Sequence, residues 1–199
     1  MLLCIDVGNT NTVVGVYEGD DLVAHWRFST DHGRMPDEYG MLLLNMLHHA
    51  GIATERIAGV AISSVVPPVT EMLAEMVSEY LKATPLIVGT GVKTGVAVRY
   101  DPPREVGADR IVNAAAAYRL YGGPACVVDF GTGTTFDALS RKGDTWAAPS
   151  RRGFAWPPRR SFSARRNCRV SIWSLPKRRS APIRWTPCAP VSSLAMWVW

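Results

Sequence analysis

The chain has 199 residues, of which 47% are hydrophobic and 20% are charged, with a formal net charge of +5 at pH 7. This length and composition are enough for one globular domain or two small ones with a buried core. This average charge does not describe the chain well, because its two parts differ in composition. Residues 146–199 hold eleven basic and no acidic residues, a charge of +11, whereas residues 1–145 hold eleven basic and seventeen acidic residues, a charge of −6.

Several classes of protein are disfavoured by what the chain contains. Its cysteines show neither a CxxC motif nor Cys/His spacing, so we expect no metal cluster and no disulfide framework. Cys4 and Cys126 lie in apolar runs, where a buried thiol is expected. The apolar runs are short, so we expect neither a signal peptide nor a membrane span, and a cytoplasmic location.

The first distinctive segment is Asp6-Val7-Gly8-Asn9-Thr10-Asn11-Thr12, between an apolar run at residues 1–5 and an alternating run at residues 13–17. This order predicts a strand, a tight turn and a second strand. Gly8 lets backbone N–H groups approach an anion, and Asp6 can hold a hydrated divalent cation that binds phosphate. The alternative is an ordinary hairpin, because Gly, Asn and Asp are turn residues.

The next segments predict a meander followed by a helix. Residues 13–17, a turn at residues 18–21 and residues 22–28 are expected to form antiparallel strands. A helix should begin at Pro36 and end at Gly51. Its predicted apolar face consists of Tyr39, Leu42, Leu43, Met46, Leu47 and Ala50.

Residues 60–88 predict a β-α-β unit. A buried strand at residues 60–66 precedes a helix that begins at Pro67 and Pro68, and residues 85–88 form the second strand. The methionines and leucines of this helix are expected to pack in the core. Its predicted buried face consists of Met72, Leu73, Met76, Val77, Tyr80 and Leu81.

A second polar motif, Gly107-Ala108-Asp109-Arg110, follows a strand at residues 96–100 and precedes a helix at residues 111–121. Aspartate at a helix start is often a cap. It is also kept ionised by the helix dipole and is then available as a base. Arg110 offers two parallel donors to a carboxylate or a phosphate.

A near-copy of the first segment follows the apolar run at residues 125–128. It reads Asp129-Phe130-Gly131-Thr132-Gly133-Thr134-Thr135, so both copies have the pattern Asp-x-Gly-x-x-x-Thr after a strand. The glycines again supply backbone exposure at the strand end. The repetition favours two related nucleotide-binding loops over two unrelated hairpins.

The three motifs together resemble the acetate kinase, sugar kinase, heat-shock chaperone and actin superfamily, and within it type III pantothenate kinase. The resemblance covers residues 1 to about 145 and implies an α/β, actin-like fold of the ribonuclease-H type. We expect a complete first half at residues 1–120, the start of a truncated second half at residues 121–144, and an aberrant tail at residues 145–199.

The resemblance also implies roles for individual residues. Asp109 would be the base that deprotonates the hydroxyl of pantothenate, Asp129 would bind a monovalent cation (K⁺ or NH₄⁺), and Asp6 would hold Mg²⁺ through ATP. The substrate would contact Tyr100, Gly107, Ala108, Asp109 and Arg110. ATP would contact Asp6, Val7, Gly8, Asn9, Thr10, Asn11, Thr12, Val13 and Thr132.

The implied reaction is ATP-dependent phosphorylation of pantothenate to 4′-phosphopantothenate, the first step of coenzyme A biosynthesis. Members of this family are homodimers, and a homodimer is doubtful for this chain because its second half departs from the family pattern. The alternative is a non-catalytic regulator of the same fold that binds nucleotide. No membrane partner is expected.

The family pattern breaks after residues 141–144, where it would continue as Tyr-Leu-Gly-Gly-Ala-Ile-Ala-Pro-Gly. Hypothetical codons GAC TAC CTG GGC GGC GCC ATC GCG CCG GGG, with the first T of TAC removed, encode residues 144–152 of this chain. We therefore interpret residues 145–199 as a frameshifted reading of a GC-rich gene, without the periodicity of a folded segment. The rival interpretation is a basic tail that bears six of the seven tryptophans and binds nucleic acid; we favour the frameshift.

Overall fold

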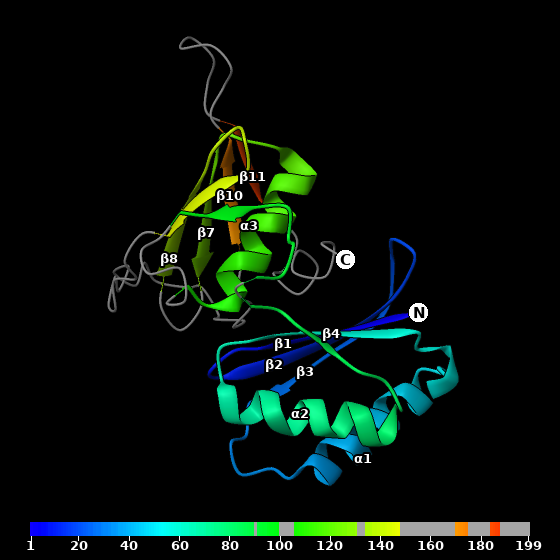
Figure 1. Ribbon diagram of the computed structural model, residues 1–199. Helices are drawn as coiled ribbons and strands as arrows, with labels where there is room; N and C mark the ends of the chain where they lie inside the picture. The colour runs from blue at the N-terminus through cyan, green and yellow to red at the C-terminus, as the bar shows by residue number, and fades with distance from the viewer. Residues whose placement is uncertain (90, 100–105, 131–133, 148–169, 175–183, 188–199) are drawn as a thin grey trace, which may run out of the picture. The chain divides into compact units, whose positions relative to one another are not determined.

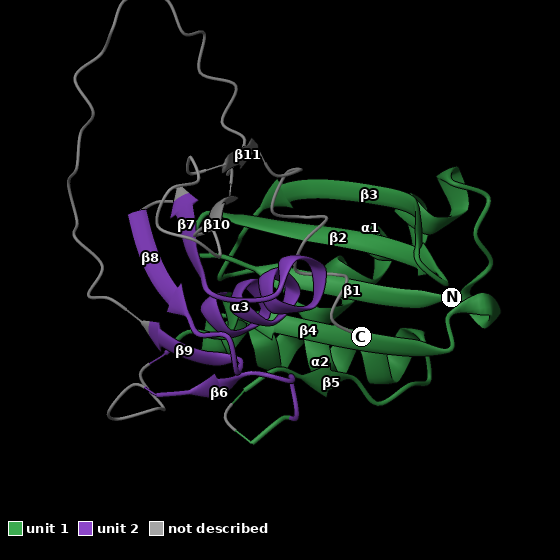
Figure 2. Ribbon diagram, turned by 90° about the horizontal axis from the view of Figure 1, so that it is seen from above, with its two compact units in different colours: residues 1–92, 107–109 green, residues 93–106, 110–199 purple. Residues whose placement is uncertain are grey.

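The structure is a computed structural model that describes residues 1–89, 91–99, 106–130, 134–147, 170–174 and 184–187 (Figure 1). It forms two compact units (Figure 2). Unit 1 comprises residues 1–92 and 107–109, and unit 2 comprises residues 93–106 and 110–199. No helix in the described ranges has both the length and the apolar character needed to cross a membrane.

Unit 1 is built on a five-stranded sheet of order β3-β2-β1-β4-β5. The antiparallel meander predicted from the sequence is confirmed, since β2 pairs antiparallel with both β1 and β3. The predicted β-α-β unit is also confirmed, because β4 runs parallel to both β1 and β5. The strands are β1 (Leu2–Val7), β2 (Asn11–Glu18), β3 (Asp21–Ser29), β4 (Gly59–Ser64) and β5 (Leu86–Ile87).

Helices α1 (Pro36–His49) and α2 (Pro67–Tyr80) lie against one face of this sheet (Figure 1). Both begin at the prolines that the sequence indicated, because proline has the helical φ and its missing N–H is not needed in the first turn. The middle residues of the apolar faces predicted for both helices are buried. Ala50, which follows the end of α1, is exposed. The fully buried side chains include Tyr39, Leu47, Leu73, Met76 and Val77. A 3₁₀ turn, η1 (Thr54–Arg56), precedes β4.

The two helices of unit 1 meet at Gly40, which has no side chain in the way of the Tyr80 ring. A Cβ added at Gly40 would lie 2.6 Å from two carbon atoms of that ring. The Tyr80 hydroxyl donates a hydrogen bond to Asp37 Oδ1 at 2.7 Å, so the ring is tethered at its far end. That hydrogen bond raises the pKa of Tyr80 to about 12.

We expect Gly40→Ala to destabilise the chain by about 1–3 kcal/mol, because overpacking at the tethered ring outweighs the gain of about 1 kcal/mol from better helix propensity. Urea unfolding followed by circular dichroism measures this. Gly89→Ala is the matched control, since a Cβ there meets no atom within 4 Å. Equal midpoints for both variants would contradict the prediction.

Unit 2 packs one helix on a second sheet. α3 (Ala108–Tyr121), whose residues belong to unit 2 from Arg110 onward, presents an alanine face to β7 and β8. The buried cluster consists of Ala114, Ala116, Ala117, Ala125, Val127 and Leu139. The strands of this sheet that precede residue 148 are β6 (Ala97–Val98), β7 (Ala125–Phe130), β8 (Thr134–Leu139) and β9 (Asp144–Ala147).

The prediction that residues 145–199 do not fold is wrong for three short segments, the first of which is the part of β9 at residues 145–147. β10 (Val170–Ser174) and β11 (Arg184–Pro187) form an antiparallel pair, and β10 pairs antiparallel with β7. The sequence of β10, Val-Ser-Ile-Trp-Ser, is rich in β-branched and aromatic residues. A sheet edge with unpaired backbone groups pairs readily with such a segment, which explains why β10 adds to the sheet at β7.

The sheets of the two units repeat one another only in part. In unit 2 the antiparallel series β7-β8-β9 repeats the series β1-β2-β3 of unit 1. In unit 1 the other neighbour of the first strand is the parallel strand β4, whereas in unit 2 the corresponding neighbour is the antiparallel strand β10. The repetition therefore ends where the sequence changes composition.

Candidate functional site

The β1–β2 loop of unit 1 is held in a closed conformation by its own backbone. The Gly8 N–H donates to the carbonyl of Asn11 at 3.0 Å, and the Thr30 hydroxyl donates to the carbonyl of Gly8 at 2.6 Å. A Cβ at Gly8 would lie 3.2 Å from the Asn11 carbonyl oxygen, so the loop is too tight for most side chains. The predicted strand, turn and strand are thus confirmed, with glycine at the point of closest approach.

The residues predicted for nucleotide binding in this loop differ in exposure. Asn9 and Thr10 are exposed at the tip, and Asp6, Asn11 and Val13 are partly buried. The side chains of Val7 and Thr12 are buried in the core, and the Thr12 hydroxyl lies 3.0 Å from that of Thr30. Their contribution to a ligand would therefore come from the backbone.

Asp6 lies next to a buried hydroxyl that the sequence analysis did not single out. Its register partner on the parallel strand β4 is Ser63, so both side chains lie on the same face of the sheet. Ser63 is 6% exposed, and its Oγ has no hydrogen-bond partner within the described residues. A buried polar atom in this situation is one that a ligand or water can satisfy.

Unit 1 brings the first three residues of the second motif, Gly107, Ala108 and Asp109, to the same end of the sheet as this loop. The Val65 N–H donates to the carbonyl of Val7 at 3.1 Å, immediately after β4. A Cβ at Gly107 would lie 3.1 Å from Val65 Cγ1, so Gly107 packs directly on that residue. Ligands of parallel sheets bind beyond the carboxyl ends of the strands, and Gly8 and Gly107 each lie at such an end, that of β1 and that of β4.

Asp109 lies inside the first turn of α3, not at the capping position. The helix begins at Ala108, three residues before the predicted start at Ile111, so Gly107 precedes it. The Asp109 carboxylate folds back over Gly107, and a Cβ there would collide with Asp109 Oδ1. A negative charge in the first turn is stabilised by the helix dipole, which favours the ionised form that a base requires.

Arg110 pairs with a carboxylate of its own unit. Its Nε and Nη2 lie 2.9 Å and 2.7 Å from Asp137 Oδ1, and Nη2 also donates to the carbonyl of Phe136 at 3.1 Å. The two side chains are only 14% and 3% exposed. The pair joins α3 to β8, and the predicted contact of Arg110 with a substrate stays a prediction.

We expect Asp137→Asn to destabilise the chain by about 1–3 kcal/mol, because the buried guanidinium loses a charged acceptor. Urea unfolding measures the loss. Glu18→Gln is the control, since the Arg56–Glu18 pair has a similar distance of 2.8 Å but side chains that are 51% and 58% exposed. Exposed pairs contribute about 0–1 kcal/mol. Equal losses in the two variants would show that burial does not matter here.

Asp129, the aspartate of the second loop, is contacted from α3. The Asn113 side-chain amide donates to Asp129 Oδ2 at 3.5 Å, and Asp129 lies directly opposite Thr135 in the β7–β8 pair. Among the described residues, no three His, Cys, Asp or Glu side chains converge on one point. This loop therefore lacks the ligand set of a transition-metal site in the part that the structure describes.

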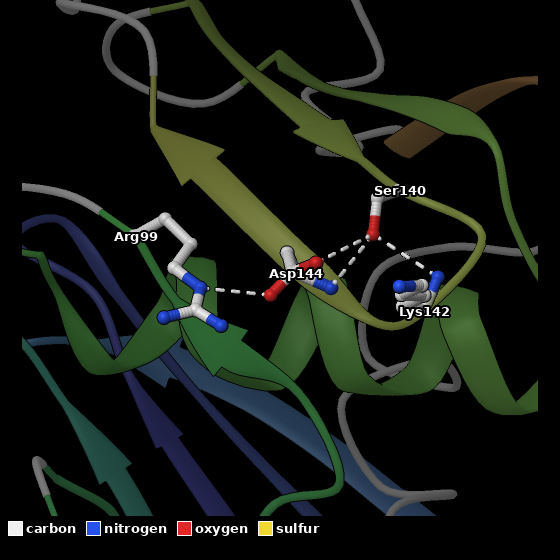
Figure 3. Close-up of polar contacts among 4 residues, drawn as sticks. All are labelled: Arg99, Ser140, Lys142 and Asp144. Carbon is white, nitrogen blue, oxygen red and sulfur yellow. Dashed lines mark hydrogen bonds and ion pairs between the residues drawn. The ribbon is translucent and has the colours of Figure 1, made fainter.

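A polar cluster at the β8–β9 turn fixes the short strand β6 (Figure 3). Arg99 Nε donates to Asp144 Oδ1 at 2.8 Å, and the Ser140 hydroxyl donates to Asp144 Oδ2 at 3.1 Å. Ser140 Oγ also accepts the backbone N–H groups of Lys142 and Asp144. The Arg99 guanidinium lowers the pKa of Asp144, so this interaction is present at neutral pH and is lost as the pH falls through that lowered pKa.

Two predicted site residues, Tyr100 and Thr132, lie outside the described residues. Sequence reasoning missed Ser63, Asn113 and Asp137. Asp137 follows the second loop by only two residues, and a lone carboxylate in an otherwise apolar and threonine-rich strand was a usable signal. The side chains of Ser63 and Asn113 resemble ordinary strand and helix residues in the sequence.

Both cysteines of the described part are buried or partly buried, as predicted. Burial raises the pKa of the Cys4 thiol to about 12 and also raises the pKa of Cys126. Both thiols are therefore protonated at neutral pH and are poor nucleophiles. Neither belongs to a candidate catalytic group.

Comparisons with known proteins agree with the three motifs. The family model for type III pantothenate kinase matches residues 2–147. The type III pantothenate kinase of Moorella thermoacetica is 55% identical over 144 residues, which cover 72% of this chain and 57% of that protein. That of Geobacter sulfurreducens is 54% identical over 144 residues, which cover 72% and 56%. This chain thus spans less than three fifths of the length of these relatives.

Solved structures are more distant. A reductive activator for a corrinoid, iron-sulfur protein aligns with a TM-score of 0.49 at 12% identity, over 70% of this chain and 29% of that one. The ROK hexokinase from Thermus thermophilus aligns with a TM-score of 0.41 at 15% identity, over 77% and 49%.

Proposed function

Because the chain belongs to the type III pantothenate kinase family, we propose that its intact gene encodes an enzyme that transfers the γ-phosphoryl group of ATP to pantothenate. The product is 4′-phosphopantothenate, the first intermediate of coenzyme A biosynthesis. One observation carries the proposal: Gly107 and Asp109 pack at the end of β4 beside the β1–β2 loop, in a single unit. A phosphate-binding loop and a candidate base at one sheet end suit phosphoryl transfer.

The β1–β2 loop fits a nucleotide phosphate and its metal ion. Gly8 lets the loop close tightly on the Asn11 carbonyl, the exposed Asn9 and Thr10 would provide donors at its tip, and the buried Ser63 hydroxyl lies on the face of Asp6. Asp6 would hold Mg²⁺ through water, since carboxylates and phosphate oxygens are its preferred ligands. When bound, Mg²⁺ would offset the negative charge that develops on the transferred phosphoryl group.

Asp109 would act on the acceptor. The primary hydroxyl of pantothenate attacks the γ-phosphorus, its proton passes to Asp109, and the bond to the β–γ bridging oxygen breaks to release ADP. Gly107, Ala108, Arg110 and Tyr100 would orient the substrate. Within unit 2, Asp137 holds the Arg110 guanidinium in a fixed orientation, which suits a residue that positions a substrate.

The second loop would hold the monovalent cation, K⁺ or NH₄⁺, at Asp129, with Thr132 contacting ATP. The fit is supported by the buried oxygen atoms around Asp129. An oxygen-only donor set with a single carboxylate suits a hard cation of low charge.

We further propose that residues 145–199 are read from a shifted frame. The support is the abrupt change in charge, the codon reconstruction of residues 144–152, and a family match that ends at residue 147. Sequencing the gene across these codons tests this directly. An intact frame that encodes the present tail, with no neighbouring frame carrying the family pattern, would overturn it.

A second experiment tests the function. It uses a frame-restored protein, whose gene has one T inserted after the codon of Asp144. We expect ATP consumption that depends on pantothenate and on K⁺, from a protein that forms a homodimer. Nucleotide binding without turnover would instead support the alternative, a regulator of the same fold.

A further inference from the structure

Unit 2 buries two oxygen atoms near Asp129 that have no hydrogen-bond partner among the described residues. Asn113 is 3% exposed, and its Oδ1 has no hydrogen-bond partner among the residues that the structure describes. The same is true of Thr135 Oγ1. Buried polar atoms are nearly always paired in folded proteins, so each of these indicates a water molecule or an ion.

The two oxygens come from elements that converge on Asp129. Thr135 is the cross-strand partner of Asp129, and directly opposed residues of antiparallel strands place their side chains on the same face of the sheet. Asn113 reaches the same carboxylate from α3, with Nδ2 at 3.5 Å from Asp129 Oδ2. A helix, a strand and its neighbour thus supply an amide, a hydroxyl and a carboxylate to one place.

The contact between Asn113 and Asp129 is too long for a strong hydrogen bond. N–H···O bonds usually measure about 2.9–3.0 Å, against 3.5 Å here. This long contact does not fix the amide strongly, and the Asn113 Oδ1 atom beside it is left for another partner.

We propose that Asn113 Oδ1 and Thr135 Oγ1 are ligands, together with Asp129, of a bound monovalent cation. This inference rests on the proposed function, which places such a cation at Asp129, and it adds two ligands from this chain. One carboxylate with two neutral oxygens balances a single positive charge. It provides fewer charged ligands than the carboxylate-rich sites of divalent cations.

The test is cation affinity, measured by thermal unfolding. The full chain, in its 199-residue form and in the frame-restored form, is titrated with KCl at an ionic strength held constant with choline chloride. We expect the unfolding midpoint of the parent, the form without substitutions, to rise with the concentration of K⁺. Asn113→Ala and Thr135→Val should each weaken the apparent affinity for K⁺ by roughly 10–100-fold.

Two further variants separate a ligand from a structural role. Val112→Ala, a buried neighbour on α3, should lower the midpoint without changing the affinity for K⁺. Asn113→Asp cannot donate to Asp129 but keeps an oxygen, so it should bind K⁺ at least as well as the parent. A structural water at this place would give no preference for K⁺ over choline.

The inference is overturned if Asn113→Ala retains the parent affinity, if Asn113→Asp loses affinity as Asn113→Ala does, or if neither parent form responds to K⁺. Turnover of the frame-restored protein is measured separately. If the parent turns over pantothenate but Asn113→Ala has unchanged affinity for K⁺, this inference is wrong and the proposed function stands. If the parent shows no turnover, the proposed function is wrong.

Discussion

Asp109→Asn is expected to lower pantothenate-dependent turnover of the frame-restored protein by roughly 10²-fold or more. Asparagine has nearly the same shape as aspartate, so the first turn of α3 and its packing on Gly107 should remain. What disappears is the ability to accept a proton from the substrate hydroxyl. The measurement is ATP consumption in a coupled assay, with urea unfolding to establish that the variant is folded.

Asp37→Asn is the matched control for this prediction. Asp37 also lies in the first turn of a helix, α1, and accepts a hydrogen bond from Tyr80. Losing its charge removes a helix-dipole interaction of about 0.3–1 kcal/mol, the same order as at Asp109, without touching the proposed base. Turnover should therefore stay near the parent value. If Asp109→Asn also keeps near-normal turnover, Asp109 serves only the helix.

Most of unit 1 could be predicted from local patterns, because its helices and strands carry clear signals in the sequence. Proline at Pro36 and Pro67 marks both helix starts, and the apolar spacing around Leu43 and Leu73 gives the buried faces. The β1–β2 loop follows from glycine and asparagine between alternating runs. These signals act over a few residues, so a single sequence is sufficient to read them.

The parts that were missed depend on contacts between distant residues. Arg110 and Asp137 are 27 residues apart, and only the packing of α3 on β8 decides that the guanidinium meets this carboxylate. The start of α3 at Ala108 was missed because Gly107 is a weak capping signal beside Asp109. The strand at Val170–Ser174 exists through the edge of β7, which local sequence does not reveal.

The second large effect concerns the tail. We expect the 199-residue chain to have little or no kinase activity, because the proposed frameshift replaces the glycine-rich continuation of the family pattern with residues 145–199, a segment of charge +11. In unit 1 a parallel strand, β4, covers the edge of β1 after a helical crossover. In unit 2 the antiparallel β10 takes the equivalent edge of β7, and the described residues of that sheet include no parallel strand at this edge. In the described part of unit 2, α3 is the one helix that packs on this sheet, and a sheet face left uncovered exposes apolar surface and promotes aggregation.

The most direct test is to purify the 199-residue and frame-restored forms side by side and to measure gel-filtration size and pantothenate-dependent ATP consumption in K⁺ buffer. We predict a soluble, active dimer for the frame-restored form and an aggregated or inactive product for the 199-residue form. A soluble 199-residue chain with full turnover would contradict this account and would make the basic tail a working part of the enzyme.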